Sequence, residues 1–312
     1  MGEGAKSSND VGVLHVVSAK EYVAGTRSAI TLEYKVGEAG ISIGGHLWII
    51  FDIRQGGDRP QVSDPKASGY VTCQTSGGAS LDVRIQSWRY LELLPDMPEI
   101  VNCIEIEVRD CPLVRGDRII ITLGKQGEGG KGFLIPTNSI DQFKFVDFAD
   151  TTGQYLVRTE ASFWPPERVK AYEGTSLPNY RRIAPIEGVA APKLRRSQAS
   201  IRVICENPLG LDVVAPSQVA VNEPLILKLK AVDRYLNVAE EYSGRVQLQT
   251  PLGGASESIH FSPKDKGVRV YRSSISFTKP GVYYIMAKDP LRGFSVRSNP
   301  IECLEFQGKY RI

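Results

Sequence analysis

Histidine is the side chain best suited to metal binding and proton transfer near neutral pH, and this sequence has three of them. They are His15, His46 and His260, and each lies in or beside a strand-like segment. None forms a His-x-His or His-Glu-x-x-His pattern. Because a transition-metal site needs three or four converging ligands, the spacing favours exposed or hydrogen-bonded imidazoles over a metal centre.

Cysteine offers a second route to chemistry, through disulfides, metal ligation or a thiolate nucleophile. The sequence has five cysteines, widely spaced and without a Cys-x-x-Cys pair: Cys73, Cys103, Cys111, Cys205 and Cys303. An odd number with these spacings argues against a disulfide framework and against a zinc site. We predict buried free thiols, with one cross-sheet disulfide as the alternative in an oxidising compartment.

The glycine-rich stretch 124–132 follows a strand-like segment, as a phosphate-binding loop would. A P-loop needs a glycine where this chain has Lys125 and a Ser or Thr where it has Gly132, and it must lead into a helix. The residues after Gly132 are strand-like instead, so no helix N-terminus would face an anion. The pattern predicts a flexible hairpin loop.

Nucleophilic and acid–base catalysis also lack a recognisable motif. No Gly-x-Ser-x-Gly elbow occurs. Glu105 and Glu107 are spaced to share one strand face, where we expect solvated charges rather than a catalytic pair.

A long polar loop near residue 58 carries the best binding candidates, because loops on a rigid scaffold often carry recognition. Its candidate residues are Asp58, Arg59 and Gln61, with Trp48 on the strand before it. The alternative is that Asp58 and Arg59 pair with each other or stabilise the turn.

The elements that must position these residues are strands, because apolar and polar residues alternate with period two. Such alternation occurs at 30–34, 81–85 and 104–108. Continuous apolar runs at 47–51 and 119–121 predict central strands that are covered on both sides. Together these segments predict a first β-sandwich over residues 11–162, after a disordered N-terminus at 1–10.

Helical periodicity is missing, and 30 glycines and 19 prolines interrupt the sequence at strand-length intervals. The predicted fold class is therefore all-β, with two antiparallel sandwiches, and the pattern excludes a Rossmann fold or a TIM barrel. Residues 201–306 show about seven short alternating segments, which predicts an immunoglobulin-like second sandwich. A short tail, 307–312, follows it.

Prolines and basic residues dominate the stretch 163–200, which we predict to be an extended connector. We interpret its arginines as a solvated face rather than an anion site.

Bulk composition limits the classes of partner. The 312 residues carry a net charge of only +3, which gives no broad positive field for nucleic acid. No long apolar run or secretory signal occurs, so we expect no membrane association and a cytoplasmic protein.

Several short motifs together resemble a known family. They include Tyr34-Lys35-Val36-Gly37-Glu38, Arg59-Pro60-Gln61, Gly69-Tyr70-Val71-Thr72, Ala231-Val232-Asp233, Gly281-Val282-Tyr283 and Arg297-Ser298-Asn299-Pro300. This pattern resembles the N-terminal region of a domain-of-unknown-function family whose members continue into a PHP-type (polymerase and histidinol phosphatase-like) metal-dependent hydrolase domain.

In that family a Gly-Asp-Leu-His motif begins the metal site, and this sequence contains no such motif. The resemblance therefore implies no catalytic residue, no metal ligand and no cofactor in this chain; a divalent metal is expected only in the absent hydrolase domain. It implies a fragment or truncated paralogue whose partner is a PHP-type catalytic domain, in cis or in trans. We expect an exposed apolar docking patch near Phe294, Phe306 and Tyr310.

Two other functions remain open. The first is a free-standing carbohydrate- or protein-binding module, which would show a coplanar set of exposed aromatic rings drawn from Trp48, Trp88, Tyr90 and Trp164. The second is an enzyme whose site is assembled from residues distant in the sequence.

Overall fold

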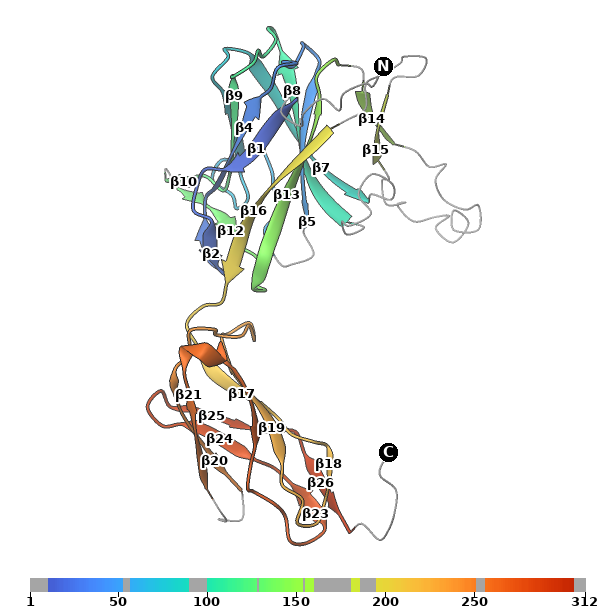
Figure 1. Cartoon of the computed structure of the whole chain (residues 1–312). Helices are drawn as coiled ribbons and strands as arrows, with labels where there is room; N and C mark the ends of the chain where they lie inside the picture. The colour runs from blue at the N-terminus through green and yellow to red at the C-terminus, as the bar shows by residue number, and fades with distance from the viewer. Residues whose placement is uncertain are drawn as a thin grey trace, which may run out of the picture. The chain divides into compact units, whose positions relative to one another are not determined.

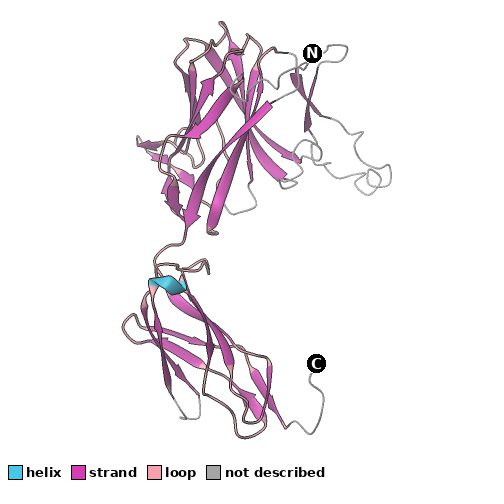
Figure 2. Cartoon of the chain, viewed as in Figure 1, coloured by secondary structure: helices cyan, strands magenta, loops and turns pink. Residues whose placement is uncertain are grey.

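A computed structural model of the chain describes residues 11–52, 57–89, 100–127, 129–153, 155–159, 181–185, 195–250 and 256–305. Within these residues the protein is all-β, and the one helix is the short 3₁₀ turn η3 (Pro263–Asp265). Figure 2 shows strands throughout both parts of the chain. The chain divides into two compact units, Met1–Ile204 and Cys205–Ile312.

Unit 1 is built from two main sheets, labelled in Figure 1. The four-stranded sheet has the order β1 (Gly12–Val16), β4 (Ile30–Val36), β9 (Arg118–Leu123), β6 (Val71–Thr75). The six-stranded sheet has the order β2 (Glu21–Val23), β16 (Arg195–Ile204), β13 (Ile140–Asp150), β5 (His46–Asp52), β8 (Ile100–Arg109), β7 (Ser80–Arg89). All these neighbours pair antiparallel except β2 and β16, which are parallel.

Three short strand pairs complete unit 1. They are β3 (Arg27–Ser28) with β12 (Phe133–Leu134), β10 (Gln126–Gly127) with β11 (Gly130–Lys131), and β14 (Tyr155–Thr159) with β15 (Arg181–Pro185). The second pair is a hairpin within the glycine-rich stretch, as the sequence predicts.

The core of unit 1 lies between the two sheets, where each strand places alternate side chains. Leu32 and Tyr34 of β4 are fully buried, and Phe51 of β5 packs against the rings of Phe143 and Phe145. The continuous run at 47–51 is buried on both faces, as predicted. The run at 119–121 is not, because Ile120 is only half-buried.

Unit 2 is an immunoglobulin-like sandwich of a three-stranded and a four-stranded sheet. The first has the order β17 (Gly210–Val214), β19 (Ile226–Val232), β22 (Val268–Arg272). The second has the order β21 (Glu257–Phe261), β20 (Gly244–Gln249), β24 (Met286–Asp289), β25 (Phe294–Arg297). A smaller sheet joins β18 (Gln218–Ala220), β26 (Ile301–Leu304) and β23 (Gly281–Tyr283).

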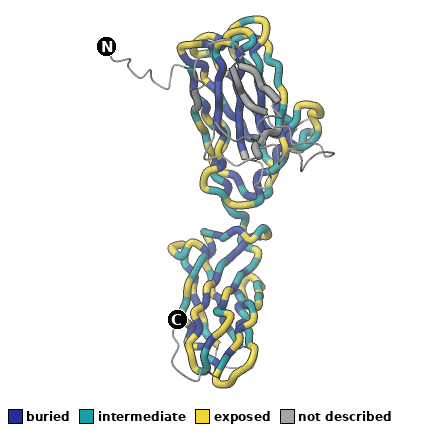
Figure 3. The backbone as a smooth tube through the Cα atoms, turned by 90° about the vertical axis from the view of Figure 1, so that its right-hand side faces the viewer, coloured by how far each residue is buried: buried dark blue, intermediate teal, exposed yellow. Residues whose placement is uncertain are grey.

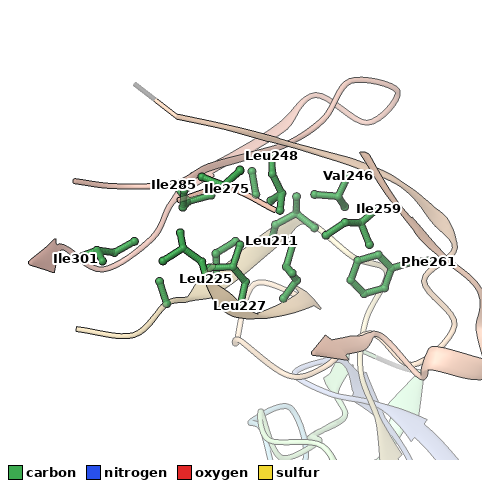
Figure 4. Close-up of a cluster of buried hydrophobic side chains, with 14 of the residues drawn as sticks. Leu211, Leu225, Leu227, Val246, Leu248, Ile259, Phe261, Ile275, Ile285 and Ile301 are labelled. Atoms are coloured by element: carbon green, nitrogen blue, oxygen red, sulfur yellow. The ribbon is translucent and has the colours of Figure 1, made fainter. Parts of the chain in front are cut away.

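Side chains from both sheets of unit 2 interdigitate in one apolar core, shown in Figure 4. Leu227 and Leu229 enter it from β19, and Val246 and Leu248 enter it from β20. Figure 3 shows buried and exposed positions along the strands of each unit. At one end of the core the Tyr283 hydroxyl donates a hydrogen bond to the Lys279 carbonyl, 2.9 Å away, in the manner of a tyrosine corner.

The boundary between the units differs from the predicted one. Ile201 and Val203, predicted to open the second sandwich, lie in β16 and pair with Phe143 and Ile140 of β13 in unit 1. Residues 195–200 also belong to β16, and 181–185 form β15, so these parts of the predicted connector are strands. Alternation shows that 195–204 is a strand, but it does not reveal that the partner strand lies upstream.

The other predicted segments fall partly outside the described residues. These are 1–10, 163–180, 186–194 and 307–312. All five cysteines are free thiols; Cys103 and Cys303 are buried and the other three are half-buried. None of the described helices is long and apolar enough to cross a membrane.

Candidate functional site

The largest cluster of charged side chains on one sheet lies on the outer face of the six-stranded sheet of unit 1. The register of β5, β8 and β7 brings these residues together, since His46 and Asp82 both stand opposite Glu107, while Trp48 and Arg84 both stand opposite Glu105. We call this set, with Arg109, the charge ladder. Directly opposed residues on one face of a sheet contact one another, so neighbouring charges must be balanced.

Each carboxylate of the charge ladder has a basic or amide partner. The Glu107 carboxylate accepts hydrogen bonds from Arg109 at 2.8 Å and Arg84 at 3.3 Å. Arg84 also pairs with Asp82, and this hydrogen bond is the main cause that lowers the pKa of the Asp82 carboxyl. The Glu105 carboxylate accepts a hydrogen bond from the Gln86 amide.

His46 lies at the buried end of the charge ladder. Its Nε2 atom is 3.7 Å from a Glu105 oxygen and 3.9 Å from a Glu107 oxygen. Its ring stacks on the Trp48 ring, with the centroids 5.1 Å apart and the planes 3° from parallel. His46 Nδ1, Trp48 Nε1 and the Gln86 side-chain oxygen have no hydrogen-bond partner in the described part of the chain.

The expectation that Glu105 and Glu107 are solvated is wrong. Glu105 is only 4% exposed, because it lies opposite the fully buried Trp48 on a strand that is covered on both faces. A buried carboxylate is tolerated when cations and hydrogen-bond donors surround it, as they do here. The charge ladder therefore fixes the register of β5, β8 and β7, and its paired carboxylates are not free to act as general bases.

Metal binding finds no support in the side chains that the structure places. In the described ranges no group of three or more His, Cys, Asp or Glu residues is arranged to hold a metal ion. His15 and His260 lie in β1 of unit 1 and β21 of unit 2, respectively, and the charge ladder includes neither.

The predicted binding residues do not form one site. Trp48 is fully buried in β5, so the expectation of an exposed ring is wrong for this residue. Arg59 is exposed. Gln61 is half-buried and serves its own loop, because its oxygen accepts hydrogen bonds from the backbone of Ser63 and Asp64 at 2.8 and 2.9 Å.

Asp58 holds the same loop against strand β12. Its carboxylate accepts hydrogen bonds from the Leu134 backbone at 2.7 Å and from the Arg27 guanidinium at 3.1 Å. The alternative of a stabilised turn is therefore the correct one, although the ionic partner is Arg27 rather than Arg59. A sequence cannot show this pairing, because the two residues come from different loops.

The predicted docking residues are only partly described. Phe294 lies in β25, is half-buried and packs against the core of unit 2. Phe306 and Tyr310 lie outside the described residues, as do Tyr90, Trp164 and the side chain of Trp88.

Sequence reasoning missed a set of buried aspartates that hold turns and strands. They are Asp147, Asp150, Asp233 and Asp289, each at most 2% exposed. Asp233 Oδ1 accepts hydrogen bonds from the backbone of Tyr235 and Asn237 at 2.8 and 2.9 Å. The available signal was an aspartate at a strand end before a turn, which is typical of side chains that cap loop backbone.

Comparisons with known proteins add little to this description. No family model matches the chain, and no curated protein matches it. Among solved structures, the chicken CNTN1 FN1-FN3 domains are 9% identical with a TM-score of 0.30, covering 95% of this chain and 67% of that one. Dimeric latent PorU from Porphyromonas gingivalis is 10% identical with a TM-score of 0.23, covering 95% of this chain and 34% of that one.

Proposed function

We propose that this chain is the noncatalytic accessory region of a PHP-type metal-dependent hydrolase. In this role its two β-sandwich units pack against the catalytic domain or position it or its substrate, in cis or in trans. The starting point is the resemblance of the sequence motifs to the region that precedes such a domain.

One observation carries the proposal: the buried ionisable groups that the structure describes are engaged in holding the sandwiches together. Asp289, Asp233 and Asp58 accept hydrogen bonds from neighbouring turns and strands. The carboxylates of the charge ladder are paired with Arg84, Arg109 and Gln86. Catalytic acids and bases need a free proton-transfer position in reach of substrate, and groups used in this way do not offer one.

The alternative of a carbohydrate-binding module loses its most specific residue. An exposed aromatic platform needs rings that reach solvent, and Trp48 is fully buried. We therefore place the accessory role first.

The first test reads the source gene beyond the codon for Ile312, together with its neighbouring genes. We expect a Gly-Asp-Leu-His motif at the start of a PHP-type domain in the same or an adjacent reading frame. That domain, expressed separately, is expected to bind the chain in a calorimetric titration with a Kd in the micromolar range or tighter. If no such reading frame exists, or if the domain does not bind, the proposal fails.

A further inference from the structure

The outer face of the three-stranded sheet of unit 2 carries apolar side chains in contact with solvent. Val214 is 45% exposed, Ile226 54% and Val270 66%. They come from β17, β19 and β22, which are adjacent in the sheet, as Figure 1 shows.

The strand register gathers these side chains around one lysine. Val214 and Val270 both stand opposite Lys228, and Ile226 precedes Lys228 by two positions on the same face of β19. Directly opposed residues on one face are about 5 Å apart at their Cβ atoms and diagonal neighbours are about 7 to 8 Å apart. The three apolar side chains therefore form one patch rather than isolated exposures. We call the patch, with Lys228, Lys230 and Arg272, the basic–apolar face.

The opposite face of the same sandwich is different. The outward positions of the four-stranded sheet are mainly polar or charged: Arg245, Gln247, Gln249, Ser258, Lys288, Ser295 and Arg297, with Met286 among them. This contrast within one unit shows that exposed apolar side chains are not a general property of its surface. Solvent alone does not favour a cluster of exposed Val and Ile residues, and such clusters typically mark contact surfaces.

Charge determines which kind of partner fits the basic–apolar face. The described residues provide one acid on this face, Asp212, and it pairs with Lys230 at 2.9 Å. Lys228 and Arg272 are exposed and have no ion-pair partner among the residues that the structure describes. The face therefore remains positive around its apolar centre. A second copy stacked on it would oppose lysine with lysine, which is unfavourable, so the complementary partner has an apolar centre and an acidic rim.

We propose that the basic–apolar face is the surface through which unit 2 binds the PHP-type domain, at an apolar patch of that domain bordered by Asp and Glu. This inference rests on the proposed function and adds the surface and its chemistry. It also replaces Phe294 as the docking residue of unit 2, since that ring packs on the core of its own unit.

Calorimetric titration of the full chain with the separately expressed PHP-type domain tests the proposal. The Lys228→Glu variant is expected to weaken binding at least about tenfold, because it opposes the acidic rim with a like charge. The triple variant Val214→Thr, Ile226→Thr, Val270→Thr removes the apolar contacts but keeps β-branched side chains, and it is expected to weaken binding by a similar factor. Binding by the wild-type chain is expected to weaken as salt is added.

The matched control is Lys288→Glu, which reverses an outward lysine on a central strand of the other sheet. It is expected to change the Kd by less than about twofold. Circular dichroism melts establish that all the variants fold.

The outcomes separate the two proposals. If the wild-type chain binds while Lys228→Glu and the triple variant bind equally well, the basic–apolar face is wrong and the proposed function stands. If the wild-type chain does not bind at all, the proposed function fails and this inference fails with it. Self-association of the chain that Lys228→Glu abolishes would identify a second copy as the occupant and would also overturn the inference.

Discussion

Asp289 illustrates how single buried charges hold this protein together. Its carboxylate is fully buried and accepts hydrogen bonds from the Tyr242 hydroxyl at 2.7 Å, the Arg292 guanidinium at 3.0 Å and the Leu291 backbone at 3.0 Å. Arg292 also lies over the Tyr242 ring, 4.9 Å from its centroid. These contacts join the end of β24 to the turn that follows it and to the segment before β20. A buried charge with this many donors is structural, and its removal leaves those donors unpaired.

We therefore predict that Asp289→Ala lowers the free energy of unfolding of unit 2 by about 2 to 4 kcal/mol. The control is Asp212→Ala, which removes a partly exposed partner of Lys230 and is expected to cost less than about 1 kcal/mol. Differential scanning calorimetry of the full chain measures both. Equal effects of the two substitutions would show that the buried hydrogen bonds of Asp289 contribute little.

Asp147 gives a prediction that depends on pH. Burial raises the pKa of its carboxyl from 3.8 to about 6, although Ser197 donates it a hydrogen bond at 2.5 Å. The folded state therefore holds the proton more tightly than the unfolded state does. Stability from this group is complete below about pH 4 and is lost as the pH rises towards 6, by up to about 3 kcal/mol.

The Asp147→Asn variant lacks this titration. Its free energy of unfolding, measured by urea denaturation, is expected to fall less between pH 4 and pH 7 than that of the wild-type chain. Other carboxyl groups titrate in both proteins, so the difference between the two pH profiles isolates Asp147. Parallel profiles for the two proteins would contradict the assignment.

At the scale of elements, alternation identified the strands well, because a half-buried strand must alternate apolar and polar residues. The segments at 30–34, 81–85 and 104–108 all lie in strands. Alternation does not specify which strands pair, so it missed that β16 returns to β13 and moved the unit boundary by several residues. Nor does a local sequence show that Trp48 is covered on its outer face or that Asp58 meets Arg27.

Tight turns between strands give the third prediction. Gly124 follows β9 with φ +78°, and a Cβ atom there would overlap the backbone nitrogen and the Cβ atom of Phe133. Gly116 has a similar φ of +90°, but nothing lies within 4 Å of its added Cβ atom. Gly116→Ala is expected to cost about 1 to 2 kcal/mol from backbone strain alone. Gly124→Ala is expected to cost at least about 2 kcal/mol more, because strand β12 must move.

Urea denaturation followed by tryptophan fluorescence reports on unit 1, because all three tryptophans lie in it. If both alanine variants are equally destabilised, the close approach of Gly124 to Phe133 does not constrain the fold.

At the scale of the whole molecule, each unit has its own apolar core. Leu227, Val246 and Phe261 belong to a cluster made only of residues from unit 2. A domain with its own core can fold alone. We predict that residues 205–312, expressed separately, unfold in one cooperative transition in circular dichroism. A broad, non-cooperative melt of this fragment would show that it depends on unit 1.

The central claim is that this chain assists hydrolysis without performing it. The most direct measurement is a steady-state assay with a phosphoester panel and added Mn²⁺ or Zn²⁺, comparing the purified chain, the PHP-type domain and an equimolar mixture. We predict no turnover by the chain alone, turnover by the domain, and a changed kcat/KM in the mixture. Metal-dependent turnover that rises in proportion to the concentration of this chain alone would contradict the account.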